Sequence, residues 1–140
     1  MSPSEHGYMV IQHHGLTPGG RVILEAGRRG LARAGWRSVL TVDDLEVFVG
    51  PRRPPKVRLV HRRCILIGTY RPHAQALSAR IGGSRSPDEI ARAAVDGGWG
   101  RYILAWRTDD GDLGVLRDPS GAVDCLAWTR GGLRLAADQP

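Results

Sequence analysis

Residues 100–128 read GRYILAWRTDDGDLGVLRDPSGAVDCLAW, and this stretch decides the fold that the sequence predicts. A β-rich run at 101–106 is followed by the polar residues 108–111, whose Asp-Gly pair is typical of a tight hairpin turn. A second apolar run, 113–116, can pair back on the first. The stretch therefore predicts an antiparallel strand pair.

The five residues after this pair, 117–121, predict another turn. They are Arg117, Asp118, Pro119, Ser120 and Gly121. An aspartate side chain can accept hydrogen bonds from backbone amides of its own turn, and glycine can adopt a backbone conformation that other residues avoid. Two further runs, 122–128 and 133–135, follow around the glycines at 131–132. We expect the last forty residues to form a β meander.

The segment before this stretch predicts a helix. Ser86 can cap its first turn, Pro87 fits its first position, and Glu89 completes the pattern of a capping box. Gly97 and Gly98 end it. Its expected buried side consists of Ile90, Ala93, Ala94 and Val95.

A second helix is predicted nearer the N-terminus, with Thr17 as its cap, Pro18 at its first position and Gly35 at its end. Apolar and small residues recur in it at spacings of three and four, which predicts an amphipathic helix. The expected apolar face consists of Val22, Ile23, Ala26, Gly30, Leu31 and Ala34.

The remaining apolar runs predict strands. The run at 7–12 suits a buried strand, and Asp43-Asp44 joins two short runs into a hairpin. A proline-rich loop separates them from a strand pair whose second member is almost entirely apolar, so we expect it to be central in its sheet. These runs are 7–12, 38–42, 45–49, 57–60 and 64–70. The sequence predicts one α+β domain, 1–140, with 1–6 as a flexible tail.

Composition excludes several classes of protein. The net charge is +6, but Lys56 is the only lysine and the arginines are scattered, so nucleic-acid binding is not favoured. No apolar run approaches the ~18 residues of a membrane span. No signal peptide precedes the first strand, so we expect a cytoplasmic protein in which Cys64 and Cys125 are reduced, buried residues of strands.

The order of elements from Ser86 to Leu135 resembles the N-terminal glutamine-amidotransferase-like domain of the asparagine synthetase superfamily. The resemblance is carried by Gly100 at the strand entry, by the turn at 117–121 and by the strand that ends in Trp128. It implies an Ntn-hydrolase-type sandwich of antiparallel sheets with flanking helices, in a reduced version.

The turn at 117–121 looks closest to that of the lasso peptide cyclases, which are asparagine-synthase-related proteins. This resemblance implies an associated asparagine-synthetase-like domain, in cis or in trans, that binds ATP and Mg²⁺ and forms an amide or isopeptide bond. It also implies a precursor peptide as a possible second partner. No cofactor is expected in this chain, and its last residues, 136–140, suggest an excerpt or a truncated frame.

Catalysis by this chain is not expected. An active member of the family exposes an N-terminal cysteine, whereas Ser2 stands at that position here. Ser2 is followed by Pro3 and polar residues, so it is a poor candidate for the nucleophile of a residual Ntn hydrolase.

The glutamine-binding elements of the family also lack counterparts. Residues 50–52 match its Arg-Gly-Pro loop in composition only, 68–70 lack the Asn and Glu of its Asn-Gly-Glu turn, and Pro87 replaces its aspartate. The leading hypothesis is therefore a non-hydrolysing domain with a structural or substrate-positioning role, in which Arg117 and Asp118 stabilise their own turn.

Two other hypotheses stay open: a stand-alone basic module that binds a peptide or polyanion, and the hydrolase that uses Ser2. A metal site is not favoured, because adjacent histidines on a strand point to opposite faces and the others show no ligand spacing. The histidines are His6, His13, His14, His61 and His73.

Overall fold

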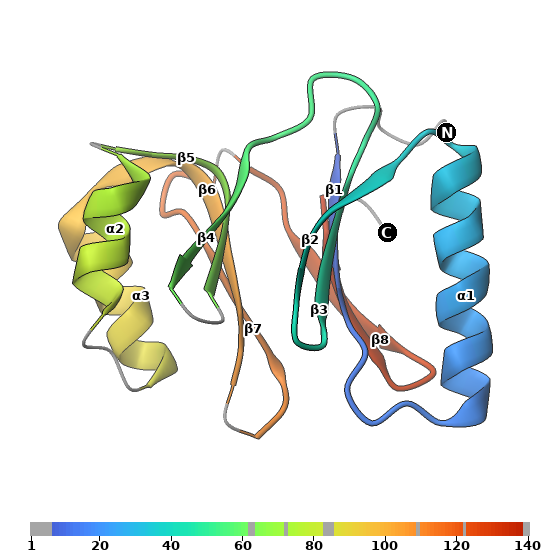
Figure 1. Cartoon of the computed structure of the whole chain (residues 1–140). Helices are drawn as coiled ribbons and strands as arrows, with labels where there is room; N and C mark the ends of the chain where they lie inside the picture. The colour runs from blue at the N-terminus through green and yellow to red at the C-terminus, as the bar shows by residue number, and fades with distance from the viewer. Residues whose placement is uncertain are drawn as a thin grey trace. The chain divides into compact units, whose positions relative to one another are not determined.

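The computed structural model describes residues 7–61, 64–71, 73–82, 86–108, 110–121 and 123–138. Over these residues the chain forms two antiparallel sheets and three helices, which confirms the α+β prediction (Figure 1). The chain divides into two compact units. Unit 1 combines the N-terminal part up to Pro55 with the C-terminal part from Cys125, and unit 2 is Lys56–Asp124. The assignment of 1–140 to one domain stays a prediction.

Unit 1 contains a five-stranded sheet in the order β2-β3-β1-β9-β8. The N-terminal strand β1 is its middle strand and pairs with β3 on one side and with the C-terminal strand β9 on the other. The elements are β1 (Tyr8–Gln12), α1 (Pro18–Arg33), β2 (Arg37–Val42), β3 (Leu45–Val49), β8 (Leu126–Arg130) and β9 (Leu133–Ala137).

Helix α1 begins as predicted and lies along one face of this sheet (Figure 1). The Thr17 hydroxyl accepts a hydrogen bond from the amide of Gly20 at 3.0 Å, and Pro18 occupies the first turn. These contacts satisfy an amide that has no partner within the helix. The hairpin β2–β3 also forms as predicted, with Asp43 at φ +52 in its turn.

The predicted apolar face of α1 is wrong in part. Gly20 and Leu24 are the buried residues, and Ile23 and Leu31 are half-buried. Small residues occur on several sides of this helix, so their spacing did not single out the side that meets the sheet. The exposed members of the predicted face are Val22, Ala26, Gly30 and Ala34.

A charged contact joins α1 to its sheet. The Arg28 guanidinium donates to Glu46 on β3 (Nε to Oε1, 3.0 Å) and to Glu25 on its own helix (2.8 Å). The other oxygen of Glu46 accepts from the Ser38 hydroxyl at 2.9 Å. Burial alone would lower the pKa of Arg28, but the two carboxylates raise it overall. The guanidinium therefore fixes one edge of α1 against β3.

Unit 2 contains a four-stranded sheet in the order β4-β5-β6-β7. Strand β5 lies between β4 and β6, as its apolar sequence predicted. The elements are β4 (Val57–His61), β5 (Cys64–Arg71), α2 (Ala74–Ile81), α3 (Pro87–Gly97), β6 (Trp99–Arg107) and β7 (Leu113–Arg117).

The helices of unit 2 pack closely on its core. Helix α3 begins as predicted, with the Ser86 hydroxyl accepting from the amide of Glu89 at 3.3 Å. Ala94 is fully buried, and Ile90 and Ala93 pack against the same core. Val95 is 43% exposed, so its assignment to the buried side is wrong.

Helix α2 was not predicted. It has eight residues, and its cap is a histidine: His73 Nδ1 accepts from the amide of Ala76 at 3.1 Å. Its fully buried residues, Leu77 and Ile81, are four positions apart and so lie on one side of the helix. That spacing was the available signal, but two apolar residues in a short segment fit a loop equally well.

The predicted C-terminal meander is also wrong. Strands β6 and β7 belong to unit 2, whereas β8 and β9 pair with each other and, through β9, with β1. Strand β8 begins only at Leu126; residues 123–125 are irregular, and Ala122 lies outside the described residues. An alternating pattern predicts a strand but does not identify the strand with which it pairs.

The two cysteines differ. Cys64 is buried in β5, as expected, and burial raises the pKa of its thiol to about 12, so the thiol is protonated at neutral pH. Cys125 is half-buried and immediately precedes β8 rather than lying in a strand. Within the described ranges, no helix is both long enough and apolar enough to cross a membrane.

Candidate functional site

The turn after β7 holds a buried carboxylate. Asp118 is only 2% exposed. Its Oδ2 accepts from the amide of Tyr102 on β6 at 3.2 Å, and its Oδ1 accepts from the amide of Ser120 at 2.9 Å and from the Ser120 hydroxyl. The amide of Asp118 in turn donates to the carbonyl of Tyr102 at 3.0 Å. The side chain therefore ties the turn to the neighbouring strand.

These hydrogen bonds determine the charge of Asp118. Burial by itself would raise the pKa of the carboxyl, but hydrogen bonds from Ser120 and from the backbone of Tyr102, Ser120 and Gly121 outweigh it and hold the pKa below its ordinary value. Asp118 is ionised at neutral pH. Because its charge is neutralised by backbone and hydroxyl donors, this carboxylate is suited to architecture rather than to proton transfer.

The rest of the turn closes on itself. The Arg117 guanidinium donates to the carbonyl of Gly121 at 3.0 Å. Gly121 has φ +66, a left-handed backbone conformation that favours glycine. Pro119 and Ser120 are exposed.

Gly100 lies at the same end of β6 as this turn, two residues before Tyr102. It pairs with Tyr70 on β5, and a Cβ on Gly100 would lie 2.0 Å from the carbonyl oxygen of Thr69. The absence of a side chain therefore allows β5 and β6 to approach. The structure brings the predicted motif residues to one end of β6, and contacts within unit 2 explain all of them except Pro119, which is exposed.

Other predicted residues do not join this turn. Ser2 and His6 lie outside the described residues. Residues 68–70 are part of β5 rather than of a turn, and 50–52 lie in the loop after β3. His14 Nδ1 is 3.3 Å from Asp44 Oδ2, and His73 caps α2. In the part of the chain that the structure describes, no three side chains of His, Cys, Asp or Glu gather as metal ligands would.

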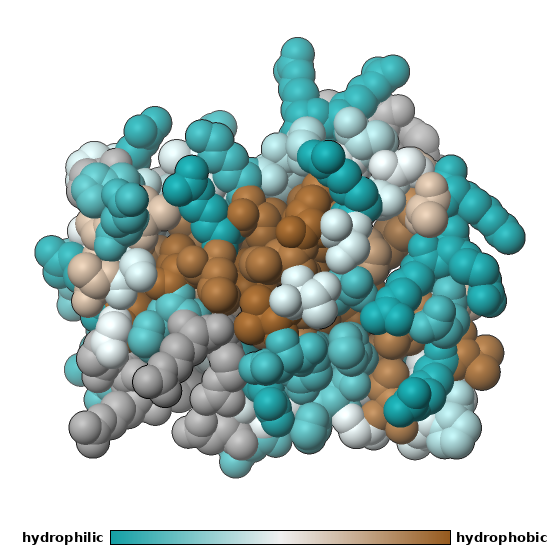
Figure 2. Space-filling view, viewed as in Figure 1, coloured by the Kyte–Doolittle hydropathy of each residue, from teal (hydrophilic) through white to brown (hydrophobic). Residues whose placement is uncertain are grey.

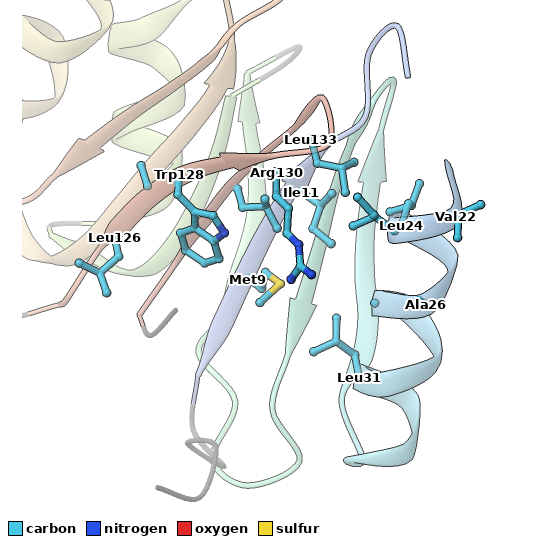
Figure 3. Close-up of a pocket in the computed structure, with 14 residues that line it drawn as sticks. Met9, Ile11, Val22, Leu24, Ala26, Leu31, Leu126, Trp128, Arg130 and Leu133 are labelled. Atoms are coloured by element: carbon cyan, nitrogen blue, oxygen red, sulfur yellow. The ribbon is translucent and has the colours of Figure 1, made fainter. Parts of the chain in front are cut away.

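Unit 1 holds a second candidate site that the sequence did not indicate. A cavity of about 790 Å³ lies between α1 and the outer part of its sheet (Figure 3). We call it the α1 groove. Met9 and Ile11 of β1 and Leu133 and Leu135 of β9 form its floor. Its sides are formed by residues 22–24, 26–27 and 31 of α1 and by residues 126–128 and Arg130 of β8.

The α1 groove is apolar with one charge. Of the described residues that line it, only Arg130 is charged, and Figure 3 shows its side chain reaching from β8 toward Met9. Gly27 lines the groove from α1, and a Cβ built on it would meet no atom within 4 Å. Open space therefore lies beside the helix at this point.

Sequence reasoning missed the groove because no residue type marks it. The lining consists of ordinary apolar residues from β1, α1, β8 and β9, which come together only when the C-terminal hairpin pairs with β1. Comparison with protein-family models, with curated proteins and with solved structures finds no match.

Proposed function

We propose that this chain is a non-hydrolysing glutamine-amidotransferase-like domain of an asparagine-synthetase-like enzyme that forms amide or isopeptide bonds with ATP. Its role is to support the associated synthetase domain or to position a peptide substrate. ATP and Mg²⁺ belong to that associated domain. The enzyme of lasso peptide cyclisation is the form of this family that the turn at 117–121 resembles most.

The observation that carries the proposal is the bonding of this turn. Asp118 and Arg117 direct their charged groups at Tyr102, Ser120 and Gly121 within the unit. Such a turn shapes the end of a sheet, and the carboxylate of Asp118 is buried within it rather than presented to a ligand such as glutamine. Together with Ser2 in place of the nucleophilic cysteine, it favours a supporting role over hydrolysis.

The two antiparallel sheets and their helices also support the proposal, since the Ntn-type sandwich is built from these parts. The α1 helix on one sheet and the α2 and α3 helices on the other agree with a reduced version of that architecture.

The test is calorimetric titration of the chain with the synthetase-like domain encoded at the same locus, at near-physiological salt. We expect saturable binding. Absence of binding would overturn the proposal. A parallel glutaminase assay compares the chain with Ser2→Ala: we expect no glutamate release from either, and release that Ser2→Ala abolishes would assign the chain to the residual hydrolases instead.

The second candidate function is a peptide-binding module. It is favoured by the α1 groove, which combines an apolar lining with the cation of Arg130. Nonspecific attraction to a +6 chain is lost as salt rises, because screening shortens the range of electrostatic forces. Peptide binding that persists at high salt, and that depends on the groove residues, would support this function.

A further inference from the structure

The sheet of unit 1 is wider than the helix that lies on it. Five strands at ~4.8 Å spacing span roughly 19 Å. An α-helix with its side chains is ~10 Å across. Within the described residues, α1 is the only helix of unit 1, so it can cover only about half of this face. The α1 groove is the uncovered half, over β9 and the edge strand β8.

Apolar groups on both sides of the groove remain exposed. Val22 on α1 is 68% exposed, Leu126 on β8 is 47% exposed, and Trp128, two positions further along β8, is half-buried. Burial of such apolar surface against a partner is favourable by ~25 cal/mol per Å². Contiguous exposed apolar surface is therefore typical of an interaction site.

The shape of the groove selects the kind of partner. Its α1 wall runs from Val22 to Leu31, which is about 14 Å at 1.5 Å per residue, or two to three helical turns. Both of its edges are exposed to solvent, whereas sites for small apolar ligands usually enclose ~70–90% of the ligand. An open apolar trough of this length suits a helix that presents one apolar side.

The charges around the groove indicate the charge of the partner. Arg130 lines it, and the α1 positions in line with Val22 and Ala26 continue to Arg29 and Arg33, which are exposed. Figure 2 shows a mostly hydrophilic surface over α1. A second copy of the chain would place these arginines against one another, and like charges in an interface are unfavourable. An acidic partner would complement them.

We infer that the α1 groove is a docking site for an acidic amphipathic helix of a protein partner. The helix lies beside α1 over β8 and β9, with apolar anchors at i, i+3 or i+4, and i+7 over Met9, Gly27 and Trp128. Its flanking carboxylates face Arg130 and the arginines of α1. The inference rests on the groove alone and does not depend on the proposed amidotransferase family.

The test uses a dye-labelled synthetic helix with a leucine stripe and flanking glutamates, and measures its binding to the full chain by fluorescence anisotropy. We expect saturable binding that Gly27→Leu weakens at least tenfold, because leucine fills the empty space at this position. Gly30→Leu is the matched control: Gly30 is three positions after Gly27 in α1, its Cβ also meets no atom within 4 Å, and it does not line the groove. This variant should keep the parental affinity.

A charge exchange provides the second variant. Arg130→Glu should weaken binding of the acidic peptide about fivefold and strengthen binding of the same peptide with lysine in place of glutamate. Circular dichroism and denaturant unfolding check that each variant is folded. This exchange keeps the inference testable if Gly27→Leu does not fold.

Three outcomes would overturn the inference. They are equal binding of the acidic and basic peptides to the parent chain, parental affinity in both Gly27→Leu and Arg130→Glu, and sedimentation showing a dimer that Gly27→Leu dissociates. The last outcome would assign the groove to a second copy. Because these measurements use only the chain and a peptide, they are independent of the titration with the synthetase-like domain.

Discussion

The two units cover their sheets in opposite ways. Unit 2 uses short helices, α2 and α3, yet Leu77, Ile81 and Ala94 are fully buried, and Tyr70 Oη donates to the carbonyl of Ala94 at 2.7 Å. Unit 1 uses a helix of sixteen residues, of which only Gly20 and Leu24 are buried, above a cavity of about 790 Å³.

This difference shows that helix length does not determine how closely a helix packs. The side chains that face the sheet determine it. In α2 and α3 the buried side chains are those of leucine, isoleucine and alanine, whereas α1 has glycine at position 20, which is buried, and at position 27, which lines the groove. A glycine that has no neighbour leaves a space, and a glycine pressed against backbone brings two elements together.

The largest expected effect is in unit 2. Leu77→Ala removes a fully buried side chain and should lower the free energy of unfolding by about 2–5 kcal/mol, since the closely packed core cannot fill the cavity that results. Leu31→Ala in unit 1 is the matched change: this leucine is half-buried at the α1 groove, and we expect a loss of less than ~2 kcal/mol. Urea denaturation measures both. Equal losses would show that the units are equally well packed.

The second effect concerns the buried carboxylate of unit 2. Asp118→Asn removes a charge that accepts hydrogen bonds from Tyr102 and Ser120, and it should cost ~1–3 kcal/mol at pH 7. The folded-state pKa of Asp118 is lowered, so the carboxylate stabilises the fold above its ordinary pKa, and this contribution is lost as pH falls through the folded-state value.

The difference between parent and Asp118→Asn should therefore shrink from pH 7 to acid pH. Denaturation series at several pH values measure it. A difference that stays constant with pH would show that shape, rather than charge, is what Asp118 contributes.

The last comparison is within α1, where replacing either of two glycines by alanine should change the free energy of unfolding in opposite directions. Gly27→Ala faces empty space and should raise the free energy of unfolding by about 0.5–1 kcal/mol, because alanine favours the helix. Gly20→Ala would place a Cβ 2.4 Å from the carbonyl oxygen of Gly131, so we expect it to be destabilising by ~1–3 kcal/mol. Thermal unfolding of the two variants is the measurement. Stabilisation by both would mean that α1 is free to shift on its sheet.

Local signals in the sequence predicted the elements that begin or end with clear capping or turn residues. Thr17 with Pro18 and Ser86 with Glu89 cap their helices as expected, and Asp43-Asp44 turns the first hairpin. Helix α2 was not predicted because its cap is His73 and its only apolar signal is the pair Leu77 and Ile81. The bonds within the turn at 117–121 were predicted, since Asp and Gly act on the backbone next to them, but the bonds from Asp118 to Tyr102 on β6 were not.

By itself the sequence determined the α+β class, most strand and helix positions, and the structural character of the turn around Asp118. Each of these depends on residues close together in the chain, where propensity and capping act. Only the tertiary structure decided that β8 and β9 join β1, which side of α1 meets the sheet, and that a groove lies there. These features depend on strand pairing across more than a hundred residues and on how side-chain volumes fill the space between elements. Local sequence patterns predict neither of these.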